Sequence, residues 1–434
     1  MKYFIFGLGA VGYSFLLKVI ENGYFDDKNF YLIDSDNNAI DKFIKIGGKK
    51  DNCYLAQINE DNYLFYLKKL RKDDYLLDFA TDIKNLDILS YCLKHQIHYL
   101  STADSSWNPD PGWISDHQHY LEYVKIKKEY QNQKGNTSVV LFGMNPGLVS
   151  CFTKMCIKEI VNKDKGPYVK KHRNKLRELL KENEYGQVCK KLGVTDIQEV
   201  DNDTHECNIP FNVNVIYSTW NVNAFYYESI SSPEIAFGDK NRYLGYGRVY
   251  DSDAKDLYLG LFNSGYEYED VSYSPQGMFK GHICTHEEIF TIRRYLTYGR
   301  YKPTVHFLYS PCKYATDSII NFKNRKIDQK HLITKEEIIG GGESVGIIVQ
   351  GKNFTTRYYG NYLNSNEIKE SATILQVSAS SYAAFVYMQK HPNEGMLFPD
   401  EMNENELLKT AKIYLKDYIS VECPKIKMTL GKGE

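Results

Sequence analysis

The stretch KYFIFGLGAVG, residues 2–12, decides the fold class of this chain. Its first half is a short apolar run typical of a buried parallel strand, and its second half has the G-x-G-x-x-G spacing and leads into a helical pattern. A second apolar run, Phe30–Ile33, ends at Asp34, where a dinucleotide-binding βαβ unit places an acid. The alternative is a glycine-rich turn of any α/β protein, and the strand, helix and acid together favour nucleotide binding.

Each glycine of this turn has a physical role in a nucleotide site. Gly7 permits a tight turn, Gly9 lets backbone N–H groups approach a pyrophosphate, and Gly12 allows a helix to pack closely. Asp34 would accept hydrogen bonds from both ribose hydroxyls and repel a 2′-phosphate, and it is followed by Ser35 with no Arg nearby. NAD is therefore favoured over NADP.

Further strand patterns alternate with helical ones along the first third of the chain, at 75–79, 98–101 and 138–142. This alternation predicts an α/β fold with a Rossmann-type, doubly wound parallel sheet, which binds ligands beyond the carboxyl ends of its strands. The predicted cofactor-binding positions are Gly7, Gly9, Ala10, Val11, Gly12, Asp34, Ser35, Ala80, Thr81, Thr102, Asn145 and Pro146.

The sequence texture changes after about residue 148. A charged helical stretch at 170–191 leads into β-rich sequence such as 212–219 and 346–349, which predicts a second, α+β domain. The segment 372–389 shows a strand-like start and an apolar helical run, and 404–418 is an amphipathic helix. We predict one domain from residues 1–147 and 373–434, and a second from residues 148–372.

Composition bounds the class of function. Lys+Arg is 54 and Asp+Glu 55 in 434 residues, so the chain carries no net field for nucleic acid or an anionic membrane. Nine Cys without a C-x-x-C pair indicate reduced thiols, and the apolar start lacks a signal-peptide cleavage site; both favour a cytoplasmic protein. The 37 Tyr and 21 Phe suggest cavities lined by rings.

Two short motifs invite chemical interpretation. In Asn145-Pro146-Gly147 the amide would lie near a nicotinamide, although Asn as N-cap and Pro at the first helical position is the favoured interpretation of the motif alone. The segment from Thr219 to Glu228 combines Trp220, aromatic rings and a carboxylate, which suits an ammonium group because a desolvated cation–π contact contributes about 2 kcal/mol. A core Trp and a surface Glu remain the alternative.

Other reactive side chains are less informative. Acids at Asp201, Glu206, Glu234 and Glu343 add options without selecting among them. His282 and His286 would share one face of a helix, but H-E-x-x-H and a third ligand are missing, so we predict no metal and treat His286 as a polar site residue. Cys312 has no identifiable activating partner for covalent catalysis.

Taken in order, several blocks resemble the bacterial-type homospermidine synthases of the saccharopine dehydrogenase-like superfamily. The blocks lie at residues 7–12, 143–149, 219–228, 285–292, 303–306, 375–377 and 391–395. The glycine block is generic, and the blocks at 143–149, 219–228 and 391–395 are much narrower. The resemblance spans nearly the entire chain.

The resemblance implies an NAD-dependent, redox-neutral aminobutyl transfer. Putrescine would lose hydride to NAD⁺, the imine would lose ammonia, a second putrescine would condense, and returning hydride would give homospermidine; spermidine would also serve as donor, releasing diaminopropane. NAD would stay bound as a recycled group. The resemblance further implies a dinucleotide-binding domain completed by the C-terminal segment, and a catalytic domain that also forms a homodimer.

The resemblance also assigns roles to residues of this chain. Trp220 matches the ring over the reacting amine, Glu228 the main ammonium-pairing carboxylate, and His286 a substrate-pocket histidine. Asn145 matches a polar contact near the nicotinamide, and Asp201 replaces a family glutamate. Two further acidic positions correspond less directly to this sequence, at Glu343 and at Ser105 beside Asp104.

Chemistry read from the residues agrees with these roles. Hydride leaves a carbon bonded to nitrogen only when that nitrogen has a free lone pair, so a site for a doubly protonated diamine must treat its two ends differently. An amino-acid or carboxyamine dehydrogenase of the same superfamily is the alternative, and it should show a carboxylate-binding Arg cluster. A third hypothesis is a nucleotide-binding regulatory module with a degenerate pocket.

Overall fold

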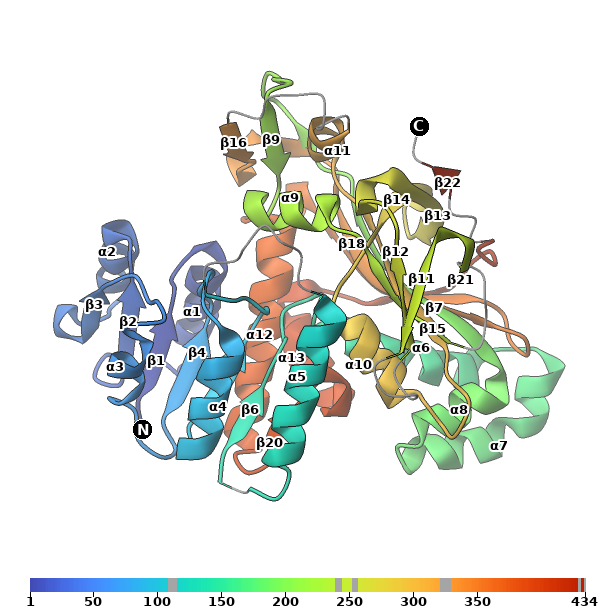
Figure 1. The fold of residues 1–434 in the computed structure, drawn as a ribbon, viewed down its shortest axis with the longest axis horizontal. Helices are drawn as coiled ribbons and strands as arrows, with labels where there is room; N and C mark the ends of the chain where they lie inside the picture. Colours follow the sequence, from blue (N-terminus) through green and yellow to red (C-terminus); the bar gives the residue numbers. More distant parts are fainter. Residues whose placement is uncertain are drawn as a thin grey trace. The chain divides into compact units, whose positions relative to one another are not determined.

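The computed structural model describes residues 1–107, 115–133, 135–238, 244–251, 257–320, 329–427 and 431–432 (Figure 1). The chain divides into two compact units. The first unit contains Met1–Gly112, Gln118–Leu148 and Ile374–Tyr414, and the second contains Trp113–His117, Val149–Thr373 and Leu415–Glu434.

The first unit is built on a seven-stranded sheet in the order β20-β6-β5-β4-β1-β2-β3. Every pairing in it is parallel, and the order changes direction at β1 and β4, as in doubly wound dinucleotide-binding sheets. The strands are β1 (Tyr3–Phe6), β2 (Phe30–Asp34), β3 (Cys53–Leu55), β4 (Tyr75–Asp78), β5 (His98–Ser101), β6 (Thr137–Val139) and β20 (Gly395–Leu397). The predicted fold class is confirmed.

Helices flank this sheet (Figure 1). They are α1 (Ala10–Glu21), α2 (Asn37–Lys45), α3 (Tyr63–Leu67), α4 (Asn85–His95), α5 (Asp116–Glu129), α12 (Ala372–Lys390) and α13 (Glu404–Leu415). The strand-like start predicted at residue 372 is wrong, because α12 is helical from Ala372 and the apolar run is its buried side.

The second unit contains an eleven-stranded mixed sheet whose longest path is β11-β12-β10-β15-β7-β18-β19-β21. Its strands are β7 (Val194–Asp203), β10 (Glu234–Ala236), β11 (Gly247–Asp251), β12 (Leu257–Leu261), β13 (Tyr268–Ser274), β14 (Gly277–Cys284), β15 (Thr304–Ser310), β18 (Gly342–Gly351), β19 (Arg357–Asn364), β21 (Ile419–Glu422) and β22 (Gly431–Lys432). Two small sheets pair β9 (Val215–Ser218) with β16 (Gln329–Leu332) and β8 (Glu206–Cys207) with β17 (Ile338–Gly340). This mixed architecture matches the predicted α+β domain.

The helices of the second unit are α6 (Leu148–Lys163), α7 (Pro167–Lys181), α8 (Tyr185–Leu192), α9 (Val222–Ile230), α10 (Glu288–Tyr295) and α11 (Lys313–Ile319). The single charged helical stretch predicted at 170–191 forms two helices, α7 and α8. Asn183, with a φ of 61°, breaks the stretch between α7 and α8. Among the described residues no helix combines the length and apolar character needed to cross a bilayer.

The C-terminal boundary differs from the sequence prediction. We assigned 373–434 to the nucleotide-binding domain, but residues from Leu415 onward belong to the second unit. The reason is that β21 pairs with β19 and β22 with β13, so the chain returns to the second sheet after α13. The short segment 113–117 likewise belongs to the second unit.

Strand β7 organises the second unit because its side chains alternate between two environments. Val200 joins an apolar core with Leu308 of β15 and Ile348 of β18. On the opposite face β7 carries acids at alternate positions, and all of them are buried. These acids are Glu199, Asp201 and Asp203.

Candidate active site

The glycine turn after β1 has the geometry of a nucleotide-binding loop. Gly7 has a φ of +79°, and a Cβ on it would lie 3.0 Å from the backbone of Ala80. A side chain at this position would therefore be disfavoured both by the backbone conformation and by the close contact. A Cβ on Gly12 would lie 2.6 Å from the carbonyl oxygen of Gly7. Both positions therefore require glycine for the close approach of α1 to the sheet.

Gly9 and Asp34 leave room for a ligand at the start of α1. A Cβ on Gly9, the N-cap of α1, would meet nothing within 4 Å. The Asp34 carboxylate accepts hydrogen bonds from the backbone N–H of Leu8 (2.6 Å) and of Asp36 (2.8 Å), and each oxygen keeps a second lone pair. An open helix N-terminus beside a fixed carboxylate fits the pyrophosphate and ribose of a dinucleotide.

The other predicted cofactor positions follow strand ends at the same edge. Phe6 of β1 pairs with Asp78 of β4, and Asp78 with Ser101 of β5, so the residues that follow these strands share one edge of the sheet. These residues are Ala80, Thr81 and Thr102, together with Ala10, Val11 and Ser35 around the glycine turn and β2.

Asn145 and Pro146 lie in a tight turn rather than at a helix start. The Gly143 N–H donates to the Pro146 carbonyl (2.7 Å), the Asn145–Pro146 peptide is cis, and α6 begins only at Leu148. The interpretation of Asn145 as N-cap and Pro146 as first helical residue is therefore wrong by two residues. Asn145 is half-buried, and Gly147 has a φ of +132° with the Gly143 carbonyl packed against it.

Asp78 is a buried acid at this edge that the sequence did not single out. Its carboxylate accepts hydrogen bonds from the Tyr99 hydroxyl (2.8 Å) and the Asn85 amide (3.1 Å). Burial raises the pKa of Asp78 to about 7, against the smaller opposing effect of these donors. Asp104, where one family acid corresponds only approximately, is engaged within the first unit by His119 and by the Tyr123 hydroxyl (2.7 Å).

The second unit brings four acids together on one face of its sheet, which we call the acidic face: Glu199, Asp201, Asp203 and Glu343. Glu343 of β18 is the direct register partner of Asp203, and Asp201 is the partner of Tyr309 in β15. Burial, then Asp201 and Asp203, raise the pKa of Glu343 well above its usual value. A bound cation would relieve the electrostatic repulsion among these acids.

Aromatic rings border the acidic face. Phe307 and Tyr309 of β15 are buried, and the Trp220 indole N–H donates to the Tyr309 hydroxyl at 3.3 Å. Trp220 is half-buried just before α9, whose N-cap Asn221 accepts hydrogen bonds from the Asn223 and Ala224 N–H groups. The local sequence thus fixes the start of the helix that carries Glu228.

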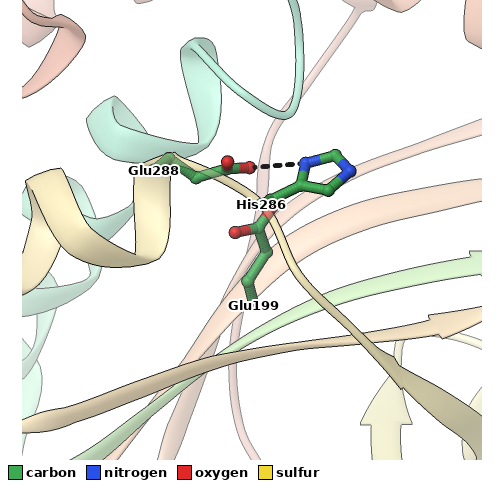
Figure 2. A group of neighbouring side chains, drawn as sticks. All are labelled: Glu199, His286 and Glu288. Atoms are coloured by element: carbon green, nitrogen blue, oxygen red, sulfur yellow. Dashed lines mark hydrogen bonds and ion pairs between the residues drawn. The ribbon is translucent and has the colours of Figure 1, made fainter. Parts of the chain in front are cut away.

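His286 links Glu228 to the buried acids. Its Nε2 lies 3.6 Å from a Glu228 carboxylate oxygen. Figure 2 shows the other contact of the ring, in which Nδ1 hydrogen-bonds Glu288 at 3.2 Å. The ring also lies 4.6 Å from that of Phe307. Burial alone would lower the pKa of His286, but Glu288 and Glu228 raise it well above its usual value, which favours the imidazolium form.

Asp203 and Glu343 are held by further polar partners. Asp203 accepts from the Thr219 hydroxyl (2.7 Å) and from His205 Nδ1 (2.7 Å), and Glu343 accepts from the Thr373 hydroxyl (2.8 Å). Burial opposes the charging of His205, but the Asp203 carboxylate outweighs it and raises the pKa of that imidazole. Hydrogen bonds therefore hold the Asp203 and Glu343 side chains of the acidic face in place.

Two sequence interpretations change in the second unit. His282 lies in β14, so His282 and His286 do not share a helix face. The ligand atoms of Glu199, His286 and Glu288 lie within 4.8 Å of one another, a spacing that a metal ion or shared protons would fit. Cys312 contacts the Cys207 thiol, and this contact, with burial, raises the pKa of Cys312, which disfavours it as a nucleophile.

Several residues of the site had no place in the sequence prediction. They are Glu199, Asp203, His205, Glu288, Tyr309 and Thr373. A usable signal was present in β7, where acids recur at every second position of a strand, a period that places them on one face. By contrast the Glu234 carboxylate accepts a hydrogen bond from the His117 N–H at 2.9 Å, within the second unit, and Glu206 is exposed.

Comparisons with known proteins agree with this geometry. Residues 3–139 match a family model described as the saccharopine dehydrogenase NADP binding domain. The chain is 25% identical to a homospermidine synthase of Blastochloris viridis over 96% of its own length and 90% of that protein's. It is 23% identical to a homospermidine synthase of Mesorhizobium japonicum over 94% of its own length and 87% of that protein's.

A solved structure shares the fold. The homospermidine synthase from Legionella pneumophila in complex with NAD superposes with a TM-score of 0.84 at 23% identity. The match covers 97% of this chain and 91% of that one. The resemblance inferred from the sequence is therefore confirmed along nearly the whole chain.

Proposed function

We propose that this protein catalyses the NAD-dependent synthesis of homospermidine from putrescine, with spermidine as a second aminobutyl donor. The observation that carries the proposal is the acidic face of the second unit, bordered by Trp220 and Tyr309 and continued by Glu228. Buried acids beside aromatic rings recognise a polycation. The similarity to homospermidine synthases over the full length supports the same activity.

The first unit would hold NAD. The open N-terminus of α1 at Gly9 suits the pyrophosphate, and Asp34 suits the ribose hydroxyls and disfavours a 2′-phosphate. When bound, the nicotinamide accepts a hydride and later returns it, which makes the overall reaction redox-neutral. Asn145, half-buried in its turn, would offer an amide to the substrate or cofactor.

The second unit would distinguish the two ends of the diamine. One amine would remain an ammonium paired with carboxylates, and the neighbouring strands β7 and β18, which carry Asp201 and Glu343, support these two acids in that role. The other amine must lose a proton before the adjacent carbon can release hydride. Trp220 would stabilise the iminium charge that appears as hydride departs, so its contribution falls on the transition state.

We assign proton transfer to the end of the site where the Glu228 and His286 side chains are in contact. Their 3.6 Å contact brings a carboxylate and an imidazole together, and this supports a role for both in exchanging a proton with a substrate nitrogen. Glu228 retains 25% side-chain exposure against 12% for His286, so Glu228 is the more accessible of the two to a ligand. We assign Glu228 to orienting the amine and His286 to moving the proton.

The decisive experiment is product analysis by mass spectrometry with putrescine and NAD at catalytic concentration. The proposal expects homospermidine and ammonia in equal amounts, no accumulation of NADH, and diaminopropane when spermidine is the donor. Stoichiometric NADH without a triamine would refute the synthase and favour the dehydrogenase alternative. NAD binding without any turnover would favour the regulatory module.

The dehydrogenase alternative would need arginines free to bind a substrate carboxylate. Among the described residues of the second unit, the buried arginines Arg293 and Arg357 already have partners in the fold. Arg293 donates to the carbonyls of Phe237 and Leu257, and Arg357 pairs with Glu422. The charge gathered beside Trp220 is instead negative.

We also propose that the protein acts as a homodimer through its second domain. The resemblance to the synthase family supports this assembly. Light scattering coupled to size-exclusion chromatography tests it: a mass near twice the 50.3 kDa of the chain is expected, and a monomer at micromolar concentration would refute it.

A further inference from the structure

An ionised carboxylate would be unstable at the position of Glu199. The residue is fully buried in β7, between its register partners Phe307 of β15 and Ile347 of β18. Among the described residues no N–H or O–H group donates a hydrogen bond to either of its carboxylate oxygens. Its polar neighbours are Glu288 and His286, whose ligand atoms lie within 4.8 Å (Figure 2).

We propose that Glu199 is protonated at neutral pH and donates a hydrogen bond to Glu288, and that this carboxyl pair positions His286 as the proton-exchanging residue of the synthase. The inference rests on the proposed function for the last step, whereas the protonation of Glu199 stands on the structure alone. Glu199 touches neither substrate nor cofactor in this scheme, so it is a positioning residue. It acts through Glu288 and then through His286.

The chemistry of two adjacent buried carboxyl groups supports the first step. Two carboxylates in one apolar site cannot both ionise, and the pair keeps one proton between them. Burial and then the Glu288 carboxylate raise the pKa of Glu199 well above its usual value. A proton on Glu199 converts a repulsive contact into a hydrogen bond and satisfies an otherwise unpaired buried group.

Glu288, rather than Glu199, is the residue that stays ionised. It is the first residue of α10, an eight-residue helix, and carries its charge at the positive end of the helix dipole. Burial opposes this charge, but the His286 imidazolium outweighs it and lowers the pKa of Glu288. The resulting row runs from neutral Glu199 through anionic Glu288 and cationic His286 to Glu228.

The row explains how His286 can release a proton. In the adduct formed when the second putrescine adds to the imine, the Nε2–H bond of His286 breaks, its electron pair stays on Nε2, and the proton passes to the departing nitrogen. The C–N bond of that nitrogen then breaks with its electron pair, ammonia leaves, and the lone pair of the remaining nitrogen forms the new C=N bond. The ring becomes neutral and keeps its Nδ1–H directed at Glu288. If Glu199 were also ionised, the added negative charge would hold that proton too tightly.

The charged and titratable groups that face His286 come from three elements and its own loop. They are Glu288 at the start of α10, Glu228 on α9, and the acids Glu199 and Asp201 on β7, with Cys284 at the end of β14. Neutralising Glu288 removes the nearest anion. The pKa of His286 then falls, and activity that requires the imidazolium is lost at a lower pH.

Infrared spectroscopy of the full-length protein tests the protonation of Glu199. We expect a carboxylic-acid C=O band at pH 7.5 that disappears in Glu199→Gln and persists in Glu336→Gln, an exposed glutamate of the same unit. Other protonated acids, such as Glu343, contribute bands that cancel in the difference between variant and wild type. A spectrum identical in wild type and Glu199→Gln would overturn the proposal.

The pH dependence of turnover tests the link to His286. In Glu288→Gln we expect the alkaline limb of kcat to move to lower pH by about one unit or more. We expect Glu199→Leu, which removes the donor to Glu288 and leaves the full Glu288 charge on His286, to shift the limb in the opposite direction, to higher pH, and Glu199→Gln, which keeps an N–H donor, to shift it less. Lower activity with an unmoved limb would leave these residues a purely structural role and overturn the proposal.

Two further results separate this inference from its alternatives. If the purified protein retains one equivalent of a divalent metal, a metal ion and not a shared proton links these side chains, and the proposal is overturned. If the wild type makes no homospermidine, the proposed function fails, yet the infrared band of Glu199 still decides the protonation. NMR of the imidazole nitrogens then reports whether His286 is doubly protonated without any need for turnover.

Discussion

Replacing Glu228 by Gln tests the charge on which the proposed diamine site depends. Gln keeps the size and hydrogen-bonding reach of the side chain and removes one negative charge. A charge-assisted hydrogen bond contributes about 1.5–3 kcal/mol, and the 25% exposure of the Glu228 side chain favours the middle of that range. At about 1.4 kcal/mol per tenfold change, kcat/KM for putrescine should fall by roughly 10- to 100-fold.

The same substitution removes a partner of His286. Since the Glu228 carboxylate helps to raise the pKa of that imidazole, the pKa should fall in Glu228→Gln and the alkaline limb of the pH profile should move to lower pH. The limb moves in this direction because a group that works as a cation loses activity as pH rises through its pKa. The change in charge thus predicts two separate readouts from one variant.

Steady-state kinetics with mass-spectrometric detection of homospermidine measures both readouts. Isothermal titration with NAD serves as the control for folding, because the nucleotide site lies in the first unit and should bind NAD with unchanged affinity. Glu336→Gln removes an exposed acid of the same unit and should behave as wild type. Wild-type kcat/KM in Glu228→Gln, or a loss that follows weakened NAD binding, would refute the role of this carboxylate.

Three further substitutions probe other parts of the chain. Trp220→Phe keeps a weaker ring and removes the N–H donor to Tyr309, so kcat should fall roughly tenfold with NAD binding unchanged; normal turnover would contradict the cation–π role. Gly12→Val places a Cβ 2.6 Å from the Gly7 carbonyl oxygen, so NAD affinity by titration should be lost, and retained affinity would show another mode of binding. Because the folded-state pKa of Asp78 is raised to about 7, stability should fall as pH rises from about 4 to 7, and denaturant unfolding of Asp78→Asn should lose most of this slope.

The parts of the fold that follow local rules could be predicted from the sequence. The glycine spacing at residues 7–12 and the acid at Asp34 depend on contacts within one βαβ unit, and the structure has this unit. The C-terminal boundary could not be predicted, because it depends on whether residues after Leu415 pair with β19, a strand about sixty residues away in sequence. Long-range pairing of this kind leaves little trace in a local pattern.

The site shows the same division. Trp220 and Glu228 lie within one helix and its lead-in, so a motif reveals them together. Glu343 and Asp203 become neighbours only when β18 pairs with β7, and Glu288 approaches Glu199 only across the packed sheet. Sequence reasoning proposed Asp201 and Glu343 through a family resemblance but did not single out Glu199, whose only local signal is the alternation of acids along β7.

The acidic face also explains how one surface can be stable both empty and filled. Four buried acids on one face oppose one another's ionisation, and burial with these neighbouring charges raises the pKa values of Glu199 and Glu343. Glu199 lies between Phe307 and Ile347, whereas Glu343 lies beside Asp203 with its hydroxyl donor Thr373. A diammonium ligand would therefore displace the proton of Glu343, which has anionic neighbours to share the new charge, and leave that of Glu199 in place. We therefore expect the two acids to differ in function, with the proton of Glu343 exchanged for substrate charge and that of Glu199 keeping His286 able to give its own proton away.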